Sequence, residues 1–291
     1  MKKALIIGAG PAGISASLYL ARNNNIDVTI VSNGQSALSR AHLIENYFGF
    51  AEPVSGEQLL ENGRKNAERL GAHFLDTELI ELQFTPELKF SAAFSGEKEE
   101  QVFDSVLIAT GASRKDPAIS GMDRFKGRGI SYCAVCDAFF YRNKAAAVIG
   151  SGEYAVHEAS TLSNSCSSVT ILTNGEELSA KAPEGINVIT AKIRELSGET
   201  TLDSVIFEDD SRLEISGLFI AIGTAGSSDI ARKLGAPLDG SNIIVDKNMA
   251  TAVPGLFAAG DCTGGLMQIA KAVSDGAIAG LGMIKFLSVS G

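Results

Sequence analysis

The fold is decided by residues 4–13, which read ALIIGAGPAG. Four apolar residues that suit a buried strand run into the pattern Gly-x-Gly-x-x-Gly, and residues 14–23 and 27–31 then suit a helix and a second strand. In such a turn the first glycine permits the tight bend, the second lets the backbone approach a pyrophosphate, and the third allows close helix–strand packing. The N-terminus of the helix adds N–H donors and partial positive charge. The segment therefore predicts a βαβ unit that binds a dinucleotide.

The chain contains a second segment with the same order of predicted elements. Residues 147–172 again read as strand, glycine turn, helix and strand, with the segments AVIG, SGEYA, VHEASTLSN and SVTIL. Each unit later closes on a similar strand and turn, LIATG at 107–111 and FIAIG at 219–223. Apolar strands that flank a helix in this order are typical of a parallel sheet. We therefore predict an α/β fold with two Rossmann-like, three-layer domains.

Two further elements are expected between the repeats. A helix is predicted over 55–70, because Ser55 and Gln58 have capping-box spacing and Gly71 lies where a glycine ends a helix. A small antiparallel sheet is predicted from three alternating segments, 79–84, 88–94 and 101–109.

The C-terminal segment decides the domain boundaries. Residues 240–291 offer another strand, a Pro-Gly turn, and Gly260-Asp261 before a long apolar helix. This segment is small for a third domain, so we expect it to return to the first one. The predicted domains are then 1–113 with 227–291, and an inserted module at 114–226. Asp261 can hydrogen-bond a ribityl hydroxyl or cap the helix that follows.

Composition excludes some classes of protein. Lys plus Arg is 25 and Asp plus Glu is 34, so the formal charge of −9 argues against a nucleic-acid binder. The start MKKALII resembles a secretory signal, but the glycines at 8–13 interrupt it and no convincing cleavage site follows. No other stretch approaches the ~18 apolar residues that a membrane span needs. We expect a cytoplasmic protein with no membrane or nucleic-acid partner.

Two of the four cysteines, Cys133 and Cys136, lie close together in sequence. A two-residue spacer can bring two sulfurs to bonding distance within one helical turn and helps to lower one thiol pKa. Zinc is the competing interpretation, but structural zinc sites usually have four ligands, and the three histidines are not at metal spacing. Asp137 is placed to hold or deliver a proton during disulfide exchange. Cys166 and Cys262 are interpreted as packing residues.

The segment around the cysteine pair is basic. Residues 113–144 contain seven Lys or Arg and three Asp, which is a net charge of +4 in a chain of −9. Such charge is either surface scatter or a basic collar that steers an acidic protein partner.

The second glycine motif has the right shape but the wrong charge. It reads Gly150-x-Gly152-x-x-Ala155, with Glu153 in the turn that should receive phosphate. The next strand ends without the Arg or Lys that a 2′-phosphate requires, although Glu176 is placed to accept ribose hydroxyls. We interpret this unit as a nucleotide fold that no longer binds a nicotinamide.

Residues 125–137 (FKGRGISYCAVCD) and 139–144 (FFYRNK) resemble the redox segment of low-molecular-weight thioredoxin reductases. The resemblance covers essentially the whole chain and includes the first glycine motif, IENY at 44–47, the Ala-Thr-Gly turn and the Gly-Asp motif. It implies a homodimer with FAD as cofactor and thioredoxin as substrate. It also implies that Cys136 faces the flavin in one pose, that Cys133 attacks thioredoxin in another, and that Asp137 is the proton donor. The implied FAD-binding residues are Gly8, Gly10, Pro11, Ala12, Gly13, Asn46, Asp261 and Gln268, and the same motifs add Gln35, Gly111 and Gly260.

The departures from that family are specific. Where the family usually has Gly-Gly-Gly and His-Arg-Arg with a later Arg, this chain has GSG at 150–152, TNG at 173–175 and Ser179. Near the flavin, Gly34-Gln35 remains of a Gly-Gly-Gln pattern, and no acid ends the second strand, where Asn33 stands. This combination resembles the ferredoxin-dependent flavin thioredoxin reductases of anaerobic bacteria, which implies reduced ferredoxin as electron donor.

Three alternatives stay open from the sequence. The chain is an NADPH- or NADH-dependent reductase, with Glu176 on the ribose in the case of NADH, or a protein with a second flavin in the altered site. From a different class, it is a flavin-binding redox module without turnover.

Overall fold

The computed structural model describes residues 1–34, 36–111, 116–132, 134–223 and 226–289; the side chains of Arg40, Val135 and Cys136 are not described. The chain divides into two compact units. Unit 1 consists of Met1–Ser113 and Gly226–Gly291, and unit 2 of Arg114–Ala225.

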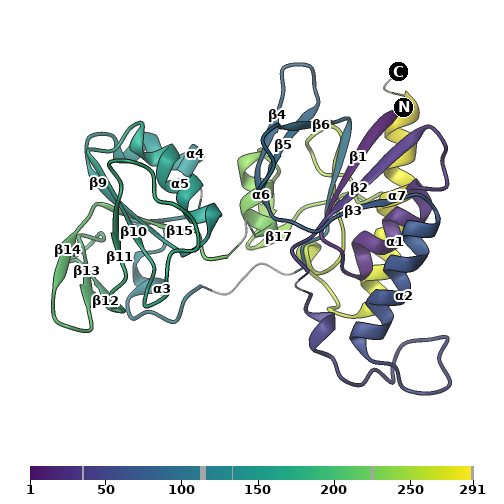
Figure 1. Cartoon of the computed structure of the whole chain (residues 1–291), viewed down its shortest axis with the longest axis horizontal. Helices are drawn as coiled ribbons and strands as arrows, with labels where there is room; N and C mark the ends of the chain where they lie inside the picture. Colours follow the sequence, from purple (N-terminus) through teal and green to yellow (C-terminus); the bar gives the residue numbers. More distant parts are fainter. Residues whose placement is uncertain (35, 112–115, 133, 224–225, 290–291) are drawn as a thin grey trace. The chain divides into compact units, whose positions relative to one another are not determined.

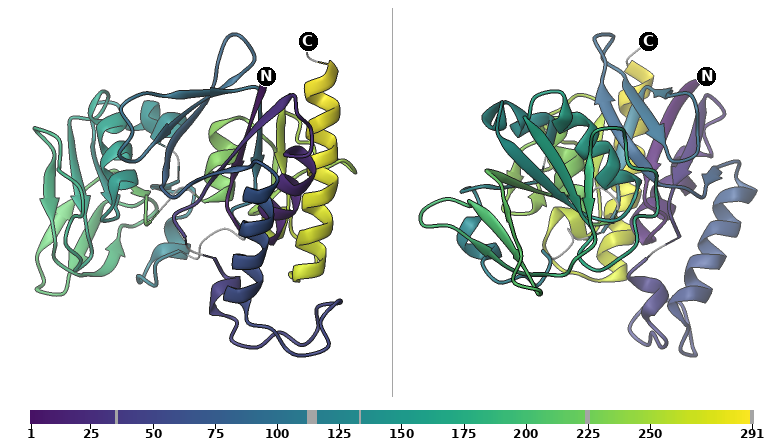
Figure 2. Two further views of the ribbon diagram at one scale, coloured as in Figure 1. Left: turned by 45° about the vertical axis from the view of Figure 1, so that its right-hand side comes forward. Right: turned by 60° about the vertical axis from the view of Figure 1, so that its left-hand side comes forward.

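Unit 1 is built on a parallel sheet with the strand order β18-β7-β1-β2-β3. Helices α1, α2 and α7 cover one side of this sheet, and the antiparallel sheet β4-β5-β6 lies on the other (Figures 1 and 2). The parallel strands are β1 (Lys2–Ile7), β2 (Ile26–Val31), β3 (His73–Leu75), β7 (Ser105–Ile108) and β18 (Leu256–Ala258). The other elements are α1 (Pro11–Leu20), η1 (Leu38–Arg40), α2 (Gly56–Arg69), β4 (Leu79–Phe84), β5 (Phe90–Phe94), β6 (Gln101–Phe103), α6 (Ser227–Lys233), β16 (Leu238–Asp239), β17 (Asn242–Ile243), η3 (Asp261–Thr263) and α7 (Ile269–Val289).

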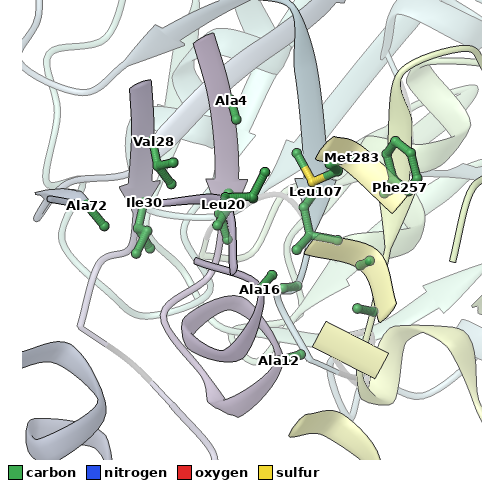
Figure 3. Close-up of a cluster of buried hydrophobic side chains, with 14 of the residues drawn as sticks. Ala4, Ala12, Ala16, Leu20, Val28, Ile30, Ala72, Leu107, Phe257 and Met283 are labelled. Atoms are coloured by element: carbon green, nitrogen blue, oxygen red, sulfur yellow. The ribbon is translucent and has the colours of Figure 1, made fainter. Parts of the chain in front are cut away.

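The core of unit 1 lies between the parallel sheet and the helices. Ala4, Ile30 and Leu107 extend from three neighbouring strands toward Leu20 of α1 and Met283 of α7 (Figure 3). Small residues let the two helices pack closely. A Cβ at Gly276 would lie 2.1 Å from the Ala12 carbonyl oxygen, so only glycine allows α7 to approach the start of α1 this closely.

Unit 2 repeats the architecture on a contiguous segment. Its parallel sheet has the order β11-β10-β9-β15-β8, with the glycine-turn strand β9 in the centre. The parallel strands are β8 (Ile130–Ser131), β9 (Ala145–Ile149), β10 (Ser168–Leu172), β11 (Asn187–Ile189) and β15 (Gly217–Ile220). The other elements are α3 (Met122–Phe125), α4 (Ala134–Asp137), η2 (Ala138–Tyr141), α5 (Glu153–Ser163) and the antiparallel strands β12 (Ile193–Ser197), β13 (Ser204–Phe207) and β14 (Arg212–Glu214).

The predicted α/β class with two Rossmann-like units is confirmed. The predicted helix at 55–70 is α2, whose N-cap Ser55 accepts a hydrogen bond from the Gln58 N–H at 3.1 Å. The strand predicted over 101–109 is wrong, because the chain changes sheets at Asp104. Residues before it pair with β5 as β6, and residues after it pair with β1 as β7.

Helix α7 corrects a second expectation. By length and composition it is apolar enough to cross a membrane, although the sequence was interpreted as having no such stretch beyond the N-terminal run. Its apolar content has a structural cause. Ala272, Ala279, Met283 and Leu287 belong to the core cluster of unit 1, so this is a helix that packs against the protein interior.

Candidate functional site

The glycine turn of unit 1 has a different geometric reason for each glycine. Gly8 has a φ of 108°, and a Cβ there would lie 2.4 Å from the Ala109 carbonyl oxygen. A Cβ at Gly13 would lie 2.0 Å from the Gly8 carbonyl oxygen, so this glycine lets α1 pack on β1. Gly10 differs, because the nearest atom to its Cβ position is the Ser36 Oγ at 4.0 Å. Its backbone faces open space, as the approach of a pyrophosphate requires.

The N-terminus of α1 is chemically open to an anion. Gly10 is its N-cap and provides no side-chain hydrogen bond, and Pro11 is the first residue of the helix. The first turn contains no acidic residue. The unsatisfied N–H groups and the helix dipole therefore favour a phosphate here. The residues fit the diphosphate of a dinucleotide cofactor.

The Gly260-Asp261 turn lies against the start of α1, since a Cβ at Gly260 would be 3.0 Å from the Ala12 Cβ. A buried network fixes this turn from α7. Asp275 accepts a hydrogen bond from the Gly260 N–H at 3.1 Å, and the Lys271 Nζ donates to the Gly260 carbonyl oxygen at 2.8 Å. Lys271 and Asp275 also form an ion pair of 2.7 Å.

Sequence reasoning missed both of these residues. The signal was an oppositely charged pair at i and i+4 inside an otherwise apolar helix, which marks a buried ion pair.

Asn46 and Gln268 come together as one contact. The Asn46 Nδ2 donates to the Gln268 Oε1 at 3.1 Å, joining the segment after η1 to the start of α7. Both side chains are exposed. Gly111 ends the described part of the Ala-Thr-Gly turn with a φ of 78°. Gln35 lies outside the described residues.

Asn33, which stands where an acid is missing at the end of the second strand, lies beside the acid Glu78. Its Nδ2 donates to the Glu78 Oε1 at 3.3 Å, at the carboxyl end of β2. Glu78 thus brings to this strand end the carboxylate that β2 itself lacks. No local pattern could have revealed it, because Glu78 lies 45 positions further along the chain.

The predicted redox segment is described in part. Cys133 lies outside the described residues, and for Cys136 the structure describes the backbone within α4 but not the side chain. Asp137 is half-buried and accepts a hydrogen bond from the Ser131 Oγ at 2.6 Å. Burial raises the pKa of the Tyr141 hydroxyl, and the negative charge of Asp137 raises it further.

The two other cysteines are poor nucleophiles. Burial raises the pKa of the Cys262 thiol to about 12, and its Sγ lies 3.3 Å from the Ala259 carbonyl oxygen. Burial also raises the pKa of Cys166. Both groups stay protonated near neutral pH, where a reactive cysteine needs its thiolate. Within the described ranges, no group of three or more His, Cys, Asp or Glu side chains is arranged to hold a metal ion.

A groove with a volume of about 1000 Å³ lies beside this segment, within unit 2. Asp137 and Phe140 line it, together with the cations Arg128, Lys144 and Arg212. At its edge the rings of Phe139 and Phe140 are 75% and 67% exposed, with ring centroids 6.2 Å apart. Adjacent exposed aromatic rings are a common anchor for a protein partner.

The basic segment is less uniform than its sequence indicates. The Lys126 ammonium is 2.6 Å from the Asp116 carboxylate and 2.8 Å from that of Asp123. Arg124 donates to the Glu199 carbonyl oxygen. Arg114 and Lys115 lie outside the described residues.

The second glycine turn has the same close backbone contacts as the first, but acidic side chains lie at the start of its helix. A Cβ at Gly150 would lie 2.2 Å from the Ala221 carbonyl oxygen, so the turn keeps the shape of the first. However, Glu153 stands in the first turn of α5. The Ser151 hydroxyl also donates a hydrogen bond to the Glu176 carboxylate, which brings a second negative charge to the turn. Two carboxylates at this helix end disfavour a pyrophosphate.

The fold and these turns define a protein with two dinucleotide-type units. Residues 2–276 match the sequence pattern of the family described as pyridine nucleotide-disulphide oxidoreductase. A thioredoxin reductase of Aquifex aeolicus is 32% identical, over 98% of this chain and 93% of its own. A thioredoxin reductase of Rickettsia felis is 34% identical, over 98% of both chains.

Two solved structures are similar across the whole chain. The atypical thioredoxin reductase TRi from Desulfovibrio vulgaris Hildenborough is 38% identical with a TM-score of 0.91, covering 99% of this chain and 98% of its own. A ferredoxin-flavin thioredoxin reductase from Clostridium acetobutylicum is 27% identical with a TM-score of 0.71, covering 99% of both chains.

This chain therefore belongs to the pyridine nucleotide-disulphide oxidoreductase family, in its low-molecular-weight thioredoxin reductase branch. Proteins of this family are FAD-dependent flavoproteins, which confirms the predicted cofactor. The oxidoreductase class is confirmed as well.

Proposed function

We propose that this chain reduces thioredoxin through a Cys133–Cys136 dithiol and that its electrons come from reduced ferredoxin rather than from NADPH or NADH. Cys136 exchanges electrons with FAD and Cys133 attacks the thioredoxin disulfide. The candidate FAD-binding residues are those gathered around the first glycine turn, the Gly260-Asp261 turn and the Asn46–Gln268 contact.

The observation that carries the donor assignment is the contrast between the two glycine turns. The start of α1 has no acidic residue in its first turn, whereas the start of α5 has Glu153, and Glu176 is hydrogen-bonded to Ser151 at the same turn. At two of the positions where the family has cations, polar side chains make contacts within unit 2. Asn174 accepts the Ile193 N–H at 2.8 Å, and the Ser179 hydroxyl donates to the Ser151 carbonyl oxygen at 2.9 Å.

A low-potential iron–sulfur protein makes a nicotinamide unnecessary. A ferredoxin near about −400 mV and a thioredoxin near about −270 mV differ by about 130 mV. For two electrons this gap corresponds to about 6 kcal/mol in the favourable direction. FAD supplies the step that converts single electrons into pairs when it is bound.

The thiol chemistry needs both cysteines and one proton-handling group. The Cys133 thiolate attacks one sulfur of the thioredoxin disulfide, which forms a mixed disulfide and releases a thioredoxin thiolate. Cys136 then attacks the Cys133 sulfur and releases the second thioredoxin sulfur, so two electrons and two protons leave the enzyme. We assign the proton transfer to Asp137, which the Ser131 hydroxyl orients.

The groove beside α4 is the proposed docking surface for thioredoxin. Phe139 and Phe140 provide exposed apolar area at one edge. The lining carries charges of both signs, from Arg128, Lys144, Arg212, Asp137, Asp203 and Glu214. Exposed aromatic rings at the edge of a polar groove are common anchors for a protein partner, and charges of both signs in the lining can orient that partner.

We further propose that the protein is a cytoplasmic homodimer. Exposed apolar side chains gather on the two segments that the Asn46–Gln268 contact joins. They are Leu43, Phe48, Phe50, Leu266 and Met267. Light scattering of the FAD-loaded protein should give twice the chain mass, and Phe48→Glu should shift it toward the monomer; a monomeric wild type would contradict the proposal.

The decisive experiment mixes the oxidised FAD-loaded enzyme anaerobically with reduced ferredoxin, NADPH or NADH and follows the flavin absorbance. We expect rapid bleaching with ferredoxin alone, followed by reduction of thioredoxin. Cys136→Ser should keep FAD but lose thioredoxin reduction, with Cys166→Ser as the matched control that retains it. Rapid bleaching by NADPH or NADH would overturn the donor assignment, whereas full activity of Cys136→Ser would overturn the dithiol chemistry.

A further inference from the structure

Glu158 is a buried acid that none of the steps above uses. It lies on α5 with 1% of its surface exposed, and its Oε2 accepts a hydrogen bond of 2.9 Å from the Ala134 N–H. Ala134 is the first residue of α4 and is completely buried. Its peptide nitrogen is bonded to the carbonyl carbon of Cys133, and α4 carries Cys136 two residues later. The carboxylate therefore grips the backbone of the spacer between the two cysteines.

The surroundings make this contact strong. Ala134 packs in one apolar cluster with Tyr154, Ala155 and Ala159, which lie on the same helix as Glu158. A charge-assisted hydrogen bond in a poorly hydrated site is about twice as strong as one between neutral groups. The imidazole of His157 lies beside the carboxylate, with its Nδ1 3.8 Å from the Glu158 Oε1, and is charged only when protonated.

A carboxylate is also an unexpected choice of acceptor at this position. An amide or a hydroxyl would hold the same N–H without the cost of burying a charge. A negative charge held at the backbone between the two cysteines disfavours their thiolate forms. A dithiol whose thiolates are disfavoured is less stable in its reduced state and is therefore a stronger reductant.

We propose that Glu158 is a positioning residue for the dithiol, which holds the spacer through the Ala134 N–H and keeps the Cys133–Cys136 pair strongly reducing. This inference rests on the proposed function, because it requires that pair to be the redox-active one. The hydrogen bond joins one buried acid to the backbone between the two cysteines.

The test compares three variants of the FAD-loaded protein. Glu158→Gln keeps an acceptor oxygen of the same reach and removes the charge. Glu158→Asp keeps the carboxylate on a side chain one methylene shorter, so it lies further from the Ala134 N–H. Glu184→Gln is the matched control, since Glu184 is exposed in the same unit and the chemical change is identical. The dithiol–disulfide equilibrium is measured by titration against glutathione, and hydrogen exchange is measured at the Ala134 amide.

We expect Glu158→Gln to shift the equilibrium about tenfold toward the dithiol, which is about 30 mV, with little change in amide exchange. Glu158→Asp should raise exchange at Ala134 about tenfold, because its shorter side chain no longer reaches the N–H. Both should lower kcat for thioredoxin reduction more than they change KM. Wild-type values of the equilibrium and of amide exchange in both variants would overturn the inference. If Glu158→Gln does not fold, wild-type values in Glu158→Asp alone overturn it.

The wild-type titration separates this result from a failure of the proposed function. A two-electron couple that disappears in Cys136→Ser supports the dithiol assignment. The Glu158 variants then test only the role of Glu158. A wild type with no such couple overturns the proposed function and this inference with it.

Discussion

The Ser151 hydroxyl donates a hydrogen bond to the carboxylate of Glu176 across the second glycine turn. This contact places a negative charge where the family's nucleotide site needs a positive one.

Removing that charge should improve the second site. For Glu176→Gln we expect about tenfold tighter NADPH binding, because a like-charge contact near 4 Å between this carboxylate and the 2′-phosphate costs between about 1 and 4 kcal/mol depending on hydration. Calorimetric titration measures the change, and Glu177→Gln is the control for an exposed neighbouring acid. Wild-type protein that already binds NADPH tightly would contradict the electrostatic argument.

The two glycine turns should respond differently to one added methyl group. Gly10 and Gly152 hold the same motif position, and at neither would a Cβ meet an atom closer than 4.0 Å. Gly10→Ala should leave the fold intact but lose FAD, since the methyl group fills the space that the pyrophosphate approaches. Gly152→Ala should retain FAD and activity. The flavin-to-protein absorbance ratio of the purified variants checks both, and loss of function in Gly152→Ala would show that the second turn still binds a nucleotide.

Gly13→Ala should fail for another reason. Its Cβ would lie 2.0 Å from the Gly8 carbonyl oxygen, so α1 must move away from β1. Overpacking of this kind costs about 1–3 kcal/mol. We expect a lower free energy of unfolding in urea for the FAD-free protein, whereas FAD-free Gly10→Ala should match the wild type. Equal stability of both variants would contradict the packing role of Gly13.

Phe140→Ala should weaken thioredoxin binding without harming the fold. The ring is 67% exposed and lines the groove beside α4. Loss of an aromatic anchor costs about 1–2 kcal/mol, so KM for thioredoxin should rise about 5–30-fold with little change in kcat. Val188→Ala, an exposed apolar change on β11 of the same unit, is the control. An unchanged KM would move the docking surface elsewhere.

Asp104 should make stability depend on acid pH. Burial alone would raise the pKa of this carboxyl, but the hydrogen bond from the Lys3 N–H at 2.8 Å and the ion pair with Lys89 at 3.1 Å outweigh it and lower the pKa below 3.8. A carboxyl with a lowered folded pKa stabilises the protein above its unfolded pKa, and the stabilisation is lost as pH falls through the folded value.

Asp104→Asn should therefore lower the free energy of unfolding by about 1 kcal/mol at pH 7. The difference from the wild type should shrink below about pH 4. Urea unfolding at several pH values measures it, with the exposed Asp239→Asn as control. A difference that stays constant down to the acid end would exclude Asp104 as the titrating group.

The repeated βαβ units were predictable because strand, glycine turn and helix are local patterns. The sequence pattern around Gly8 and Gly150 predicted both turns, and the structure gives each the same backbone constraint. The strand over 101–109 was mispredicted because its apolar alternation continues through Asp104, although the two halves pair with different sheets. Pairing partners are set by contacts far apart in the chain, which a local pattern does not contain.

The site was predictable only where a motif carries it. Gly10 and Asp261 belong to motifs, whereas Glu78, Lys271 and Glu158 act through hydrogen bonds to other segments of the chain. Nothing in the sequence near Glu78 or Glu158 indicates their partners. The i, i+4 spacing of Lys271 and Asp275 indicates their ion pair, but not the bond of Lys271 to Gly260. Their positions follow from the packing of whole elements, such as α7 on α1 and α5 on α4.

Unit 1 cannot be completed until the strand β18 and the helix α7 have been synthesised. Unit 1 begins at the N-terminus, but its outer strand and its longest helix come from residues 256–289. At about 5–20 residues per second, the ribosome needs about 3–13 seconds to make the 64 residues from 226 to 289. Throughout that interval unit 2 is already fully translated, while Ala12 and Ala16 of α1 still lack the glycines of α7 that cover them. The nascent chain therefore carries an uncovered apolar face until its last turns emerge, and a ribosome that stops early releases an aggregation-prone fragment rather than a weak enzyme.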